Sequence, residues 1–292
     1  MQEGDVNYTV ASSIEQDILH YINNSDSENY SEVLKSDERW EVFYHLSPTR
    51  TAIIDWYDFK YDAEILEVGG GFGAITGRLC DKVRGVTVVE KAEYRAKAIA
   101  QRYSTRKNIC VITGDVLKLT YDKKFDYIVV NGVLGTSGCG TDDISAYADF
   151  LKKLSLLLKE QGKILFTIEN RLGIKYFCGV KEKYSNTAFM GINRYPEKTN
   201  GRTFSKFEVE RILKEAKIEK YKFYYPMPDH ITTQVVYSDN YLPGNNINER
   251  IMTYYPQEES LLIVENIVYS DLVENKVFTF MANSFFVECS FN

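Results

Sequence analysis

The stretch ILEVGGGFGAIT, residues 65–76, constrains the fold more than any other part of this sequence. An apolar run that is typical of a buried strand leads into a glycine-rich turn, and helix-forming residues follow the turn. A turn of this kind lets backbone N–H groups approach a ligand closely at the start of a helix. The stretch therefore predicts a strand–turn–helix unit with a ligand site at the turn.

From about residue 63 onward, short apolar runs alternate with helical stretches, which is typical of βαβ units and a parallel sheet. The expected strands are residues 64–69, 85–90, 108–114, 125–132, 162–169, 219–226 and 283–290. The expected helices are residues 74–82, 92–103, 145–160 and 202–216. Two segments, at about residues 171–201 and 227–282, show no regular pattern and are interpreted as lid insertions, with unrecognised helices or disorder as the alternative.

The N-terminal segment is predicted to be helical. Ser12 with Glu15 can form a capping box, and Ser47 followed by Pro48 is typical of a helix start. We therefore expect an N-terminal helical extension or lid over residues 1–59 and one domain over residues 60–292.

Composition narrows the class of protein. The net charge of −6, from 35 basic and 41 acidic side chains, provides no global field that attracts a polyanion, so nucleic acid is disfavoured as a partner. Five cysteines without CxxC spacing and only three histidines predict neither a disulfide framework nor a metal site. No signal peptide or membrane-spanning apolar run is visible, and we expect a cytoplasmic protein.

Three ligands fit a glycine turn of this kind: a dinucleotide, a nucleoside triphosphate or S-adenosylmethionine. Gly69, Gly71 and Ala74 satisfy the dinucleotide pattern G-x-G-x-x-A, which is weak evidence alone. No Lys-Ser/Thr pair follows the turn, which disfavours a triphosphate. Glu67, two residues before the first glycine, suits a ligand with an ammonium group better than a pyrophosphate.

Two further acids follow the next two expected strands. Glu90 can accept hydrogen bonds from both ribose hydroxyls, and Asp115 can bind the exocyclic amine of adenine. Each acid alone could equally be a helix cap or a solvated loop residue. Because Glu67, Glu90 and Asp115 lie at the ends of three successive strands in order, they favour S-adenosylmethionine as the single ligand.

The pattern E-x-G-x-G-x-G resembles the class I S-adenosylmethionine-dependent methyltransferases, and the resemblance covers about residues 63–169. It implies an α/β fold, a Rossmann-like, doubly wound seven-stranded sheet whose seventh strand, residues 283–290, is antiparallel. It also implies a metal-independent enzyme that binds S-adenosylmethionine. The implied cofactor-binding residues are Glu67, Gly69, Gly71, Gly73, Glu90, Lys91, Asp115, Val116 and Asn131.

The segment after the fourth strand bears on the methyl acceptor. Many DNA and RNA amine methyltransferases of this fold carry an N/D-P-P-Y/F sequence here, whereas this chain has NGVL at residues 131–134, without proline or aromatic ring. The glycine turn is also similar to that of the ribosomal RNA adenine dimethyltransferases. The departure at residues 131–134 nevertheless disfavours base methylation.

Later segments resemble a narrower group, the methyltransferase domains associated with bacterial glycosyltransferases of cell-surface polysaccharide or lipopolysaccharide. The resemblance lies in IENRLGIKYFCG, RTFS and FYYPMPDH. It implies O-methylation of a sugar or glycan precursor, with a small-molecule or glycan substrate and a glycosyltransferase partner. An Asp-His pair of that group is replaced here by Lys183 and Tyr184.

The candidate catalytic residues are His230, which has Asp229 beside it, and Glu169, which ends the fifth strand. The alternative for His230 is a surface loop histidine. Candidate substrate contacts, each also open to a structural role, are Asn170, Arg171, Tyr176 and Arg202. Three other functions stay open: a catalytically silent cofactor-binding module that partners a glycosyltransferase, an RNA methyltransferase, and a NAD-dependent oxidoreductase.

Overall fold

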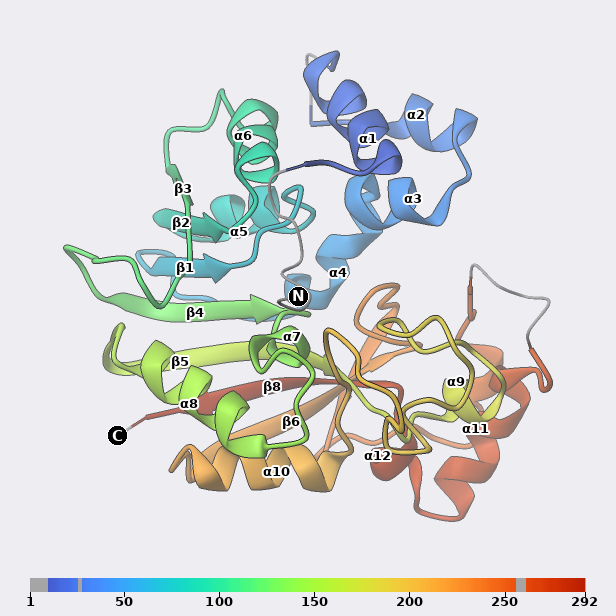
Figure 1. Cartoon of the computed structure of the whole chain (residues 1–292). Coiled ribbons are helices and arrows are strands. Elements are labelled where there is room, and N and C mark those ends of the chain that lie inside the picture. Colours follow the sequence, from blue (N-terminus) through green and yellow to red (C-terminus); the bar gives the residue numbers. More distant parts are fainter. Residues whose placement is uncertain (1–9, 26–27, 256–260, 292) are drawn as a thin grey trace. The chain divides into compact units, whose positions relative to one another are not determined.

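The computed structural model describes residues 10–25, 28–255 and 261–291 (Figure 1). It divides into two compact units, Met1–Phe125 and Asp126–Asn292. Residues 1–9, 26–27, 256–260 and 292 lie outside the described residues. The predictions of an extension over 1–59, a domain over 60–292 and an insertion at 227–282 each include some of them. Within the described ranges no helix is long and apolar enough to cross a bilayer.

The first unit begins with helices, as the capping signals predict. They are α1 (Ser13–Asn23), α2 (Ser31–Ser36), α3 (Trp40–Leu46), the 3-10 helix η1 (Pro48–Thr51) and α4 (Ala52–Asp55). The capping box is formed, with the Ser12 backbone N–H donating to Glu15 Oε2 at 2.9 Å. Ile18 and Leu46 pack in one buried cluster with Phe72 of the glycine turn. The N-terminal helices and the turn therefore share a core.

Three parallel strands follow in the first unit, in the order β3-β2-β1 (Figure 1). They are β1 (Glu64–Val68), β2 (Gly85–Glu90) and β3 (Ile109–Thr113), connected by α5 (Thr76–Lys82) and α6 (Glu93–Arg102). Val68 pairs with Val89, and Glu90 pairs with Thr113. The carboxyl ends of the three strands, where the predicted ligand contacts follow, therefore meet at one edge of this sheet.

The second unit contains a sheet in the order β4-β5-β8-β6-β7. Its strands are β4 (Phe125–Asn131), which starts at the last residue of the first unit, β5 (Leu158–Glu169), β6 (Lys220–Met227), β7 (Val235–Ser238) and β8 (Ser284–Ser290). The last strand, β8, lies between β5 and β6 and is antiparallel to both, as predicted. The predicted α/β class is confirmed, with β7 as an addition to the seven expected strands.

The helices of this unit are α7 (Leu134–Ser137), α8 (Ile144–Ser155), α9 (Ile174–Phe177), α10 (Lys206–Glu215), α11 (Glu265–Glu274) and α12 (Phe278–Met281), with the 3-10 helix η2 (Ile247–Glu249). The predicted helix at 145–160 is too long, because the apolar run continues past its true end at Ser155. The insertion at 227–282 is also more regular than expected, since it contains β7 and α11. Hydrophobic periodicity did not reveal β7, a four-residue strand that pairs with β6 at the sheet edge.

Candidate cofactor and acceptor sites

The glycine turn after β1 has a backbone that favours glycine. Gly69, Gly71 and Gly73 have φ values of 72°, 58° and 81°. A Cβ atom at Gly73 would lie 2.8 Å from the ring of Tyr103, whereas one at Gly71 would meet nothing within 4 Å. The backbone at Gly71 therefore borders open space, in which a ligand can approach the main chain.

Glu90, at the end of β2, is held by backbone donors. The N–H of Gly71 donates to Oε2 at 2.9 Å, and the N–H of Ala92 donates to Oε1 at 3.0 Å. Each carboxylate oxygen still has a lone pair for another donor, such as a ribose hydroxyl. The carboxylate thus connects the glycine turn to the end of β2 in a fixed orientation.

Glu67, on β1, is buried and accepts a hydrogen bond at 2.7 Å from the hydroxyl of Thr76, the first residue of α5. Burial, with the nearby charge of Glu90, raises the pKa of Glu67 to about 7. A cation beside this carboxyl group would favour its ionised form. An incoming ammonium would therefore change the protonation of Glu67.

Lys91, Asp115 and Val116 complete the predicted set in the first unit. Lys91 Nζ lies 3.7 Å from Asp115 Oδ2, and the N–H of Leu117 donates to Asp115 Oδ1 at 3.0 Å. Val116, the next residue in the sequence after Asp115, is buried. Asp115 comes two residues after the Thr113–Glu90 pair, so it continues the same edge of the sheet. The role of these residues in cofactor binding stays a prediction.

The ninth predicted cofactor residue, Asn131, ends β4 in the second unit. Thr167 of β5 donates from Oγ1 to Asn131 Oδ1 at 2.7 Å and accepts from the N–H of Gly132 at 2.8 Å. Gly132 has a φ of 71°, and a Cβ atom there would lie 3.8 Å from Nε2 of His230. The imidazole of His230 therefore borders the turn that follows β4.

A buried charge cluster joins both candidate catalytic residues. Lys175 Nζ lies 3.4 Å from Glu169 Oε2 and 3.3 Å from Asp229 Oδ2, and all three side chains are buried. Although burial acts to raise it, the charges of Lys175, Lys183 and His230 lower the pKa of Glu169 to about 2. The pKa of Asp229 is lowered as well, since Lys175 and His230 outweigh its burial.

Backbone contacts orient the residues around His230. Its N–H donates to Ser284 Oγ at 2.8 Å, and Asp229 Oδ1 accepts from the N–H groups of Ile231 and Thr232 at 2.9 and 3.0 Å. His230 is 1% exposed, so it is not the surface loop histidine of the alternative interpretation. The His230 ring thus borders Gly132, and the neighbouring residue Asp229 shares the Lys175 ammonium with Glu169.

The four candidate substrate contacts have protein partners. Asn170 is fully buried and its amide donates to the carbonyl oxygens of Phe280 and Ala282 at 2.7 and 2.8 Å. Arg171 Nε donates to Glu208 Oε2 at 2.6 Å, and the Tyr176 hydroxyl donates to Glu169. The Arg202 guanidinium lies 4.8 Å from the centroid of the Tyr195 ring. Substrate contact by these four residues stays a prediction.

Lys175 and Thr167 did not stand out in the sequence. Lys175 lies between Ile174 and Tyr176 in a short helix directly after β5, and a charged residue inside an apolar stretch was the available signal. Thr167 lies within the apolar run of β5, and nothing local separates it from other strand threonines.

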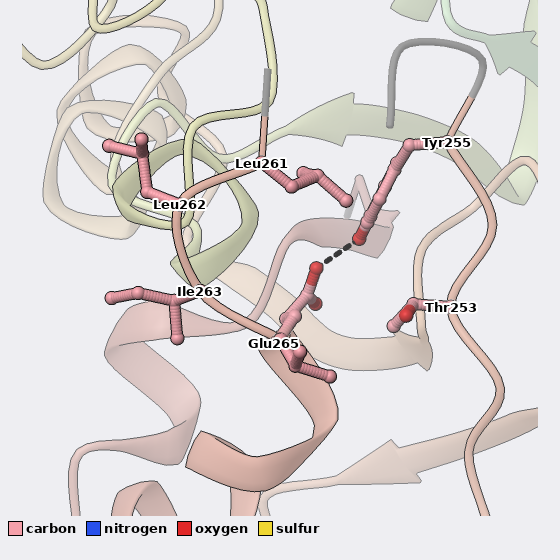
Figure 2. A pocket seen from close by; sticks show the side chains of 7 residues that line it. Thr253, Tyr255, Leu261, Leu262, Ile263 and Glu265 are labelled. Atoms are coloured by element: carbon pink, nitrogen blue, oxygen red, sulfur yellow. Dashed lines mark hydrogen bonds between the residues drawn. The ribbon is translucent and has the colours of Figure 1, made fainter. Parts of the chain in front are cut away.

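A shallow apolar pocket lies elsewhere in the second unit (Figure 2). It is lined by Thr253, Tyr255, Leu261, Leu262, Ile263, Val264 and Glu265. The Tyr255 hydroxyl donates to the buried carboxylate of Glu265, which also accepts from Tyr269. None of the predicted site residues lines this pocket. In the part of the chain that the structure describes, no group of three or more His, Cys, Asp or Glu residues could hold a metal ion.

Comparison with known proteins adds a family match. The family model of ribosomal RNA adenine dimethylase matches residues 47–146. The chain is 35% identical over 80 residues to the "Probable ribosomal RNA small subunit methyltransferase A" of Methanococcoides burtonii, which is 27% of this chain and 29% of that protein. It is 30% identical over 112 residues to the "Ribosomal RNA small subunit methyltransferase A" of Malacoplasma penetrans, which is 37% and 40% of the two chains. The chain thus spans less than half the length of these relatives.

Solved structures establish the fold. A Thermotoga maritima protein, described as an S-adenosylmethionine-dependent methyltransferase and possible histamine N-methyltransferase, aligns with 89% of this chain and 97% of its own, at a TM-score of 0.50 and 17% identity. The chain has the class I methyltransferase fold. Phosphoethanolamine N-methyltransferase 1 of Haemonchus contortus shares this fold at a TM-score of 0.51 and 13% identity, over 95% of this chain and 48% of its own.

The prediction that nucleic acid is an unlikely partner is wrong. Nucleic acid was disfavoured because of the net charge and of residues 131–134, but the family model and the curated relatives carry names of ribosomal RNA methylation. The physical reason is that a net charge summed over a whole chain does not say where the cations lie. A chain with net charge −6 can still present a basic surface.

Proposed function

We propose that this chain is an S-adenosylmethionine-dependent methyltransferase whose acceptor is an adenine amine of RNA. The observation that supports it best is the family match over residues 47–146, which runs from just before η1 through the glycine turn and past Asn131. The matched segment includes every predicted cofactor residue. The proposal implies a cytoplasmic protein.

The residues of the first unit fit the cofactor. S-adenosylmethionine, when bound, supplies an electrophilic methyl group on a sulfonium. Glu67 would hold its ammonium, Glu90 its ribose hydroxyls, and Asp115 with Val116 its adenine. The open space at Gly71 supports this assignment, since a side chain there would fill it. Lys91, whose Nζ lies 3.7 Å from Asp115 Oδ2, would help to orient this carboxylate.

The residues of the second unit would handle the acceptor. In an in-line displacement the enzyme mainly aligns the nucleophile, and the amine nitrogen forms the new bond to carbon while the bond from carbon to sulfur breaks. Asn131, fixed by Thr167, is the candidate to orient the amine. The amine loses one proton after transfer, and His230 beside Gly132 is the candidate to receive it, with Asp229 and Glu169 stabilising the imidazolium.

A second candidate function is O-methylation of a sugar hydroxyl in a surface-glycan precursor. It is favoured by residues 131–134, which lack the proline and ring of amine methyltransferases, and by the position of His230 next to Gly132. A hydroxyl must give up its proton during transfer, so a positioned base matters more for it than for an amine. A glycosyltransferase partner belongs to this candidate alone.

The experiment that tests the proposal offers radiolabelled S-adenosylmethionine to the full chain with two kinds of acceptor. One is a transcript of small-subunit ribosomal RNA, and the other is the glycan-intermediate fraction of cells. Methylated adenosine in the digested transcript, found by mass spectrometry, is the expected result. Radiolabel in the glycan fraction and none in RNA would contradict the proposal and support O-methylation of a sugar hydroxyl.

Two controls make this test sharper. Calorimetry with S-adenosylmethionine and NADH checks the cofactor, and binding of NADH alone would overturn both candidates. His230→Gln separates the acceptors: loss of a general base costs about 100-fold or more in kcat for a hydroxyl. We expect a smaller loss for an amine.

A further inference from the structure

One stretch of the second unit is strongly basic, although the chain as a whole is acidic. We call residues 181–202 the basic loop. It contains five cations but only two acidic residues, Glu182 and Glu197. The cations are Lys181, Lys183, Arg194, Lys198 and Arg202.

One of the two acids does not reach the surface of the basic loop. Glu182 is 1% exposed, and its carboxylate accepts from the N–H groups of Tyr184 and Ser185 at 2.8 and 3.0 Å. It also accepts from the Tyr195 hydroxyl at 3.1 Å. Glu197 is the exposed acid of the loop, and Arg194 and Lys198 are exposed with it, whereas Lys183 Nζ lies 4.0 Å from Oε1 of the buried Glu169. The exposed part of the loop therefore carries more positive than negative charge.

The backbone of the basic loop is held in an unusual conformation. Asn186, Phe189, Arg194 and Tyr195 have φ values of 53°, 63°, 61° and 55°, a region that non-glycine residues rarely adopt. Such conformations persist only where the surrounding contacts impose them, and they are concentrated at ligand sites. The hydrogen bonds to Glu182 are contacts of that kind, so the cations are presented by a preorganised surface.

Aromatic rings lie beneath two of the cations. Lys183 Nζ is 4.9 Å from the centroid of the Tyr184 ring, and the Arg202 guanidinium is 4.8 Å from that of Tyr195. Arg202 Nη2 donates to the carbonyl oxygen of Arg194 at 3.5 Å, and a guanidinium has further N–H groups that can donate to an oxyanion. Basic side chains interleaved with aromatic rings are typical of surfaces that bind single-stranded nucleic acid.

The basic loop lies against the segment that follows β4. The N–H of Arg202 donates to the carbonyl of Gly135 at 2.9 Å. A Cβ atom at Gly135 would be 2.5 Å from the Tyr184 hydroxyl, and one at Gly140 would be 1.8 Å from the carbonyl oxygen of Thr199. The loop is therefore packed within a few residues of Asn131, the residue proposed to orient the acceptor.

We propose that the basic loop binds the phosphodiester backbone of the RNA acceptor and so holds the target nucleotide at the turn after β4. The inference rests on the proposed RNA acceptor and adds the surface that recognises it. Phosphate contacts provide affinity that depends on salt and not on sequence.

The test measures binding of a short, fluorescently labelled single-stranded oligoribonucleotide by anisotropy, from about 50 to 200 mM KCl. The variant carries Arg194→Glu and Lys198→Glu, two exposed residues of the loop. Its matched control carries Arg211→Glu and Lys214→Glu, two exposed residues of α10, with the same change in charge. Thermal melting of both variants checks that they fold.

Loss of two phosphate contacts should lower the slope of log affinity against log salt by about 1.4. The loop variant should also bind about tenfold more weakly at low salt, for oligonucleotides of different sequence alike. The neutral variant Arg194→Gln, Lys198→Gln should show a smaller loss. The α10 control should bind as the wild type does.

Each other outcome overturns the inference in a recognisable way. If the wild type methylates RNA and the loop variant binds it with unchanged affinity and slope, the inference fails while the proposed function stands. If the α10 control loses as much RNA affinity as the loop variant, the inference likewise fails while the proposed function stands. If the wild type binds uridine diphosphate through the loop and binds no RNA, both the inference and the RNA acceptor are wrong.

Discussion

The two units bury their acidic groups in different ways. In the first unit, Glu90 is held by two backbone N–H groups and Glu67 by one hydroxyl. In the second, Glu169 and Asp229 share the buried ammonium of Lys175, and Asp229 also accepts from two backbone N–H groups. A site built mainly on backbone donors needs glycines and acids at set spacings, and is therefore visible as a motif. A site built from distant side chains leaves no such pattern.

Replacing Lys175 should have the largest effect on the second unit. Lys175→Met removes the cation shared by two buried carboxylates, and leaving such charges unpaired costs about 3–5 kcal/mol of the free energy of unfolding. Chemical denaturation measures this loss. Lys214→Met, at an exposed position on α10, should change stability by less than about 0.5 kcal/mol. Equal losses of stability in the two variants would show that the Lys175 ammonium does not hold the buried carboxylates of the second unit.

Replacing Glu67 should change how stability depends on pH. Its folded-state pKa of about 7 is above the usual 4.5, so the folded state holds the proton more tightly. The stability that this provides is fully present below pH 4.5 and is lost as the pH rises to 7, by roughly 1.4 kcal/mol per pH unit. Glu67→Gln stays neutral and should lack this decline.

Denaturation at several pH values measures the difference, with Glu219→Gln, an exposed position, as control. In the wild type, affinity for S-adenosylmethionine should also rise with pH through about 7, because its ammonium favours the ionised carboxylate. An affinity that does not change with pH would show that Glu67 only supports Thr76.

Replacing Glu90 should have the smallest of the three effects, on cofactor affinity. Glu90→Gln keeps the shape of the side chain but weakens acceptance from ribose hydroxyls and places an amide donor near the N–H of Gly71 or Ala92. The expected loss is about 2 kcal/mol, or roughly 30-fold in Kd for S-adenosylmethionine. Calorimetry measures it, with Glu219→Gln again as control. Unchanged affinity would mean that Glu90 only orders the glycine turn.

Much of the first unit could be predicted from local patterns. The capping box at Ser12, the strand ends at Val68 and Glu90 and the turn at Gly71 all depend on residues a few positions apart. In the second unit the antiparallel β8 was also predicted, but from the resemblance to known methyltransferases and not from periodicity. The end of α8 and the strand β7 were missed, because an apolar run or a four-residue strand has no distinct period.

The charge of the second unit shows the same limit. The net charge led us to disfavour RNA, although the basic loop lies in the sequence between Lys181 and Arg202. The sequence could not show that Glu182 is buried, because its burial depends on tertiary contacts such as the hydrogen bond from the Tyr195 hydroxyl. A sum of charges treats a buried carboxylate and an exposed lysine as equal, whereas a ligand meets only the exposed one.

The sequence alone therefore determined the α/β class, the positions of the glycine turn and its acids, and the positions of most strands along the chain, because these follow from signals within one turn of helix or one strand. Only the tertiary structure brought Lys175 to Asp229, 54 residues away, and the ring of His230 to Gly132. Such contacts form when strands distant in sequence become neighbours in the sheet, as β5, β8 and β6 do here.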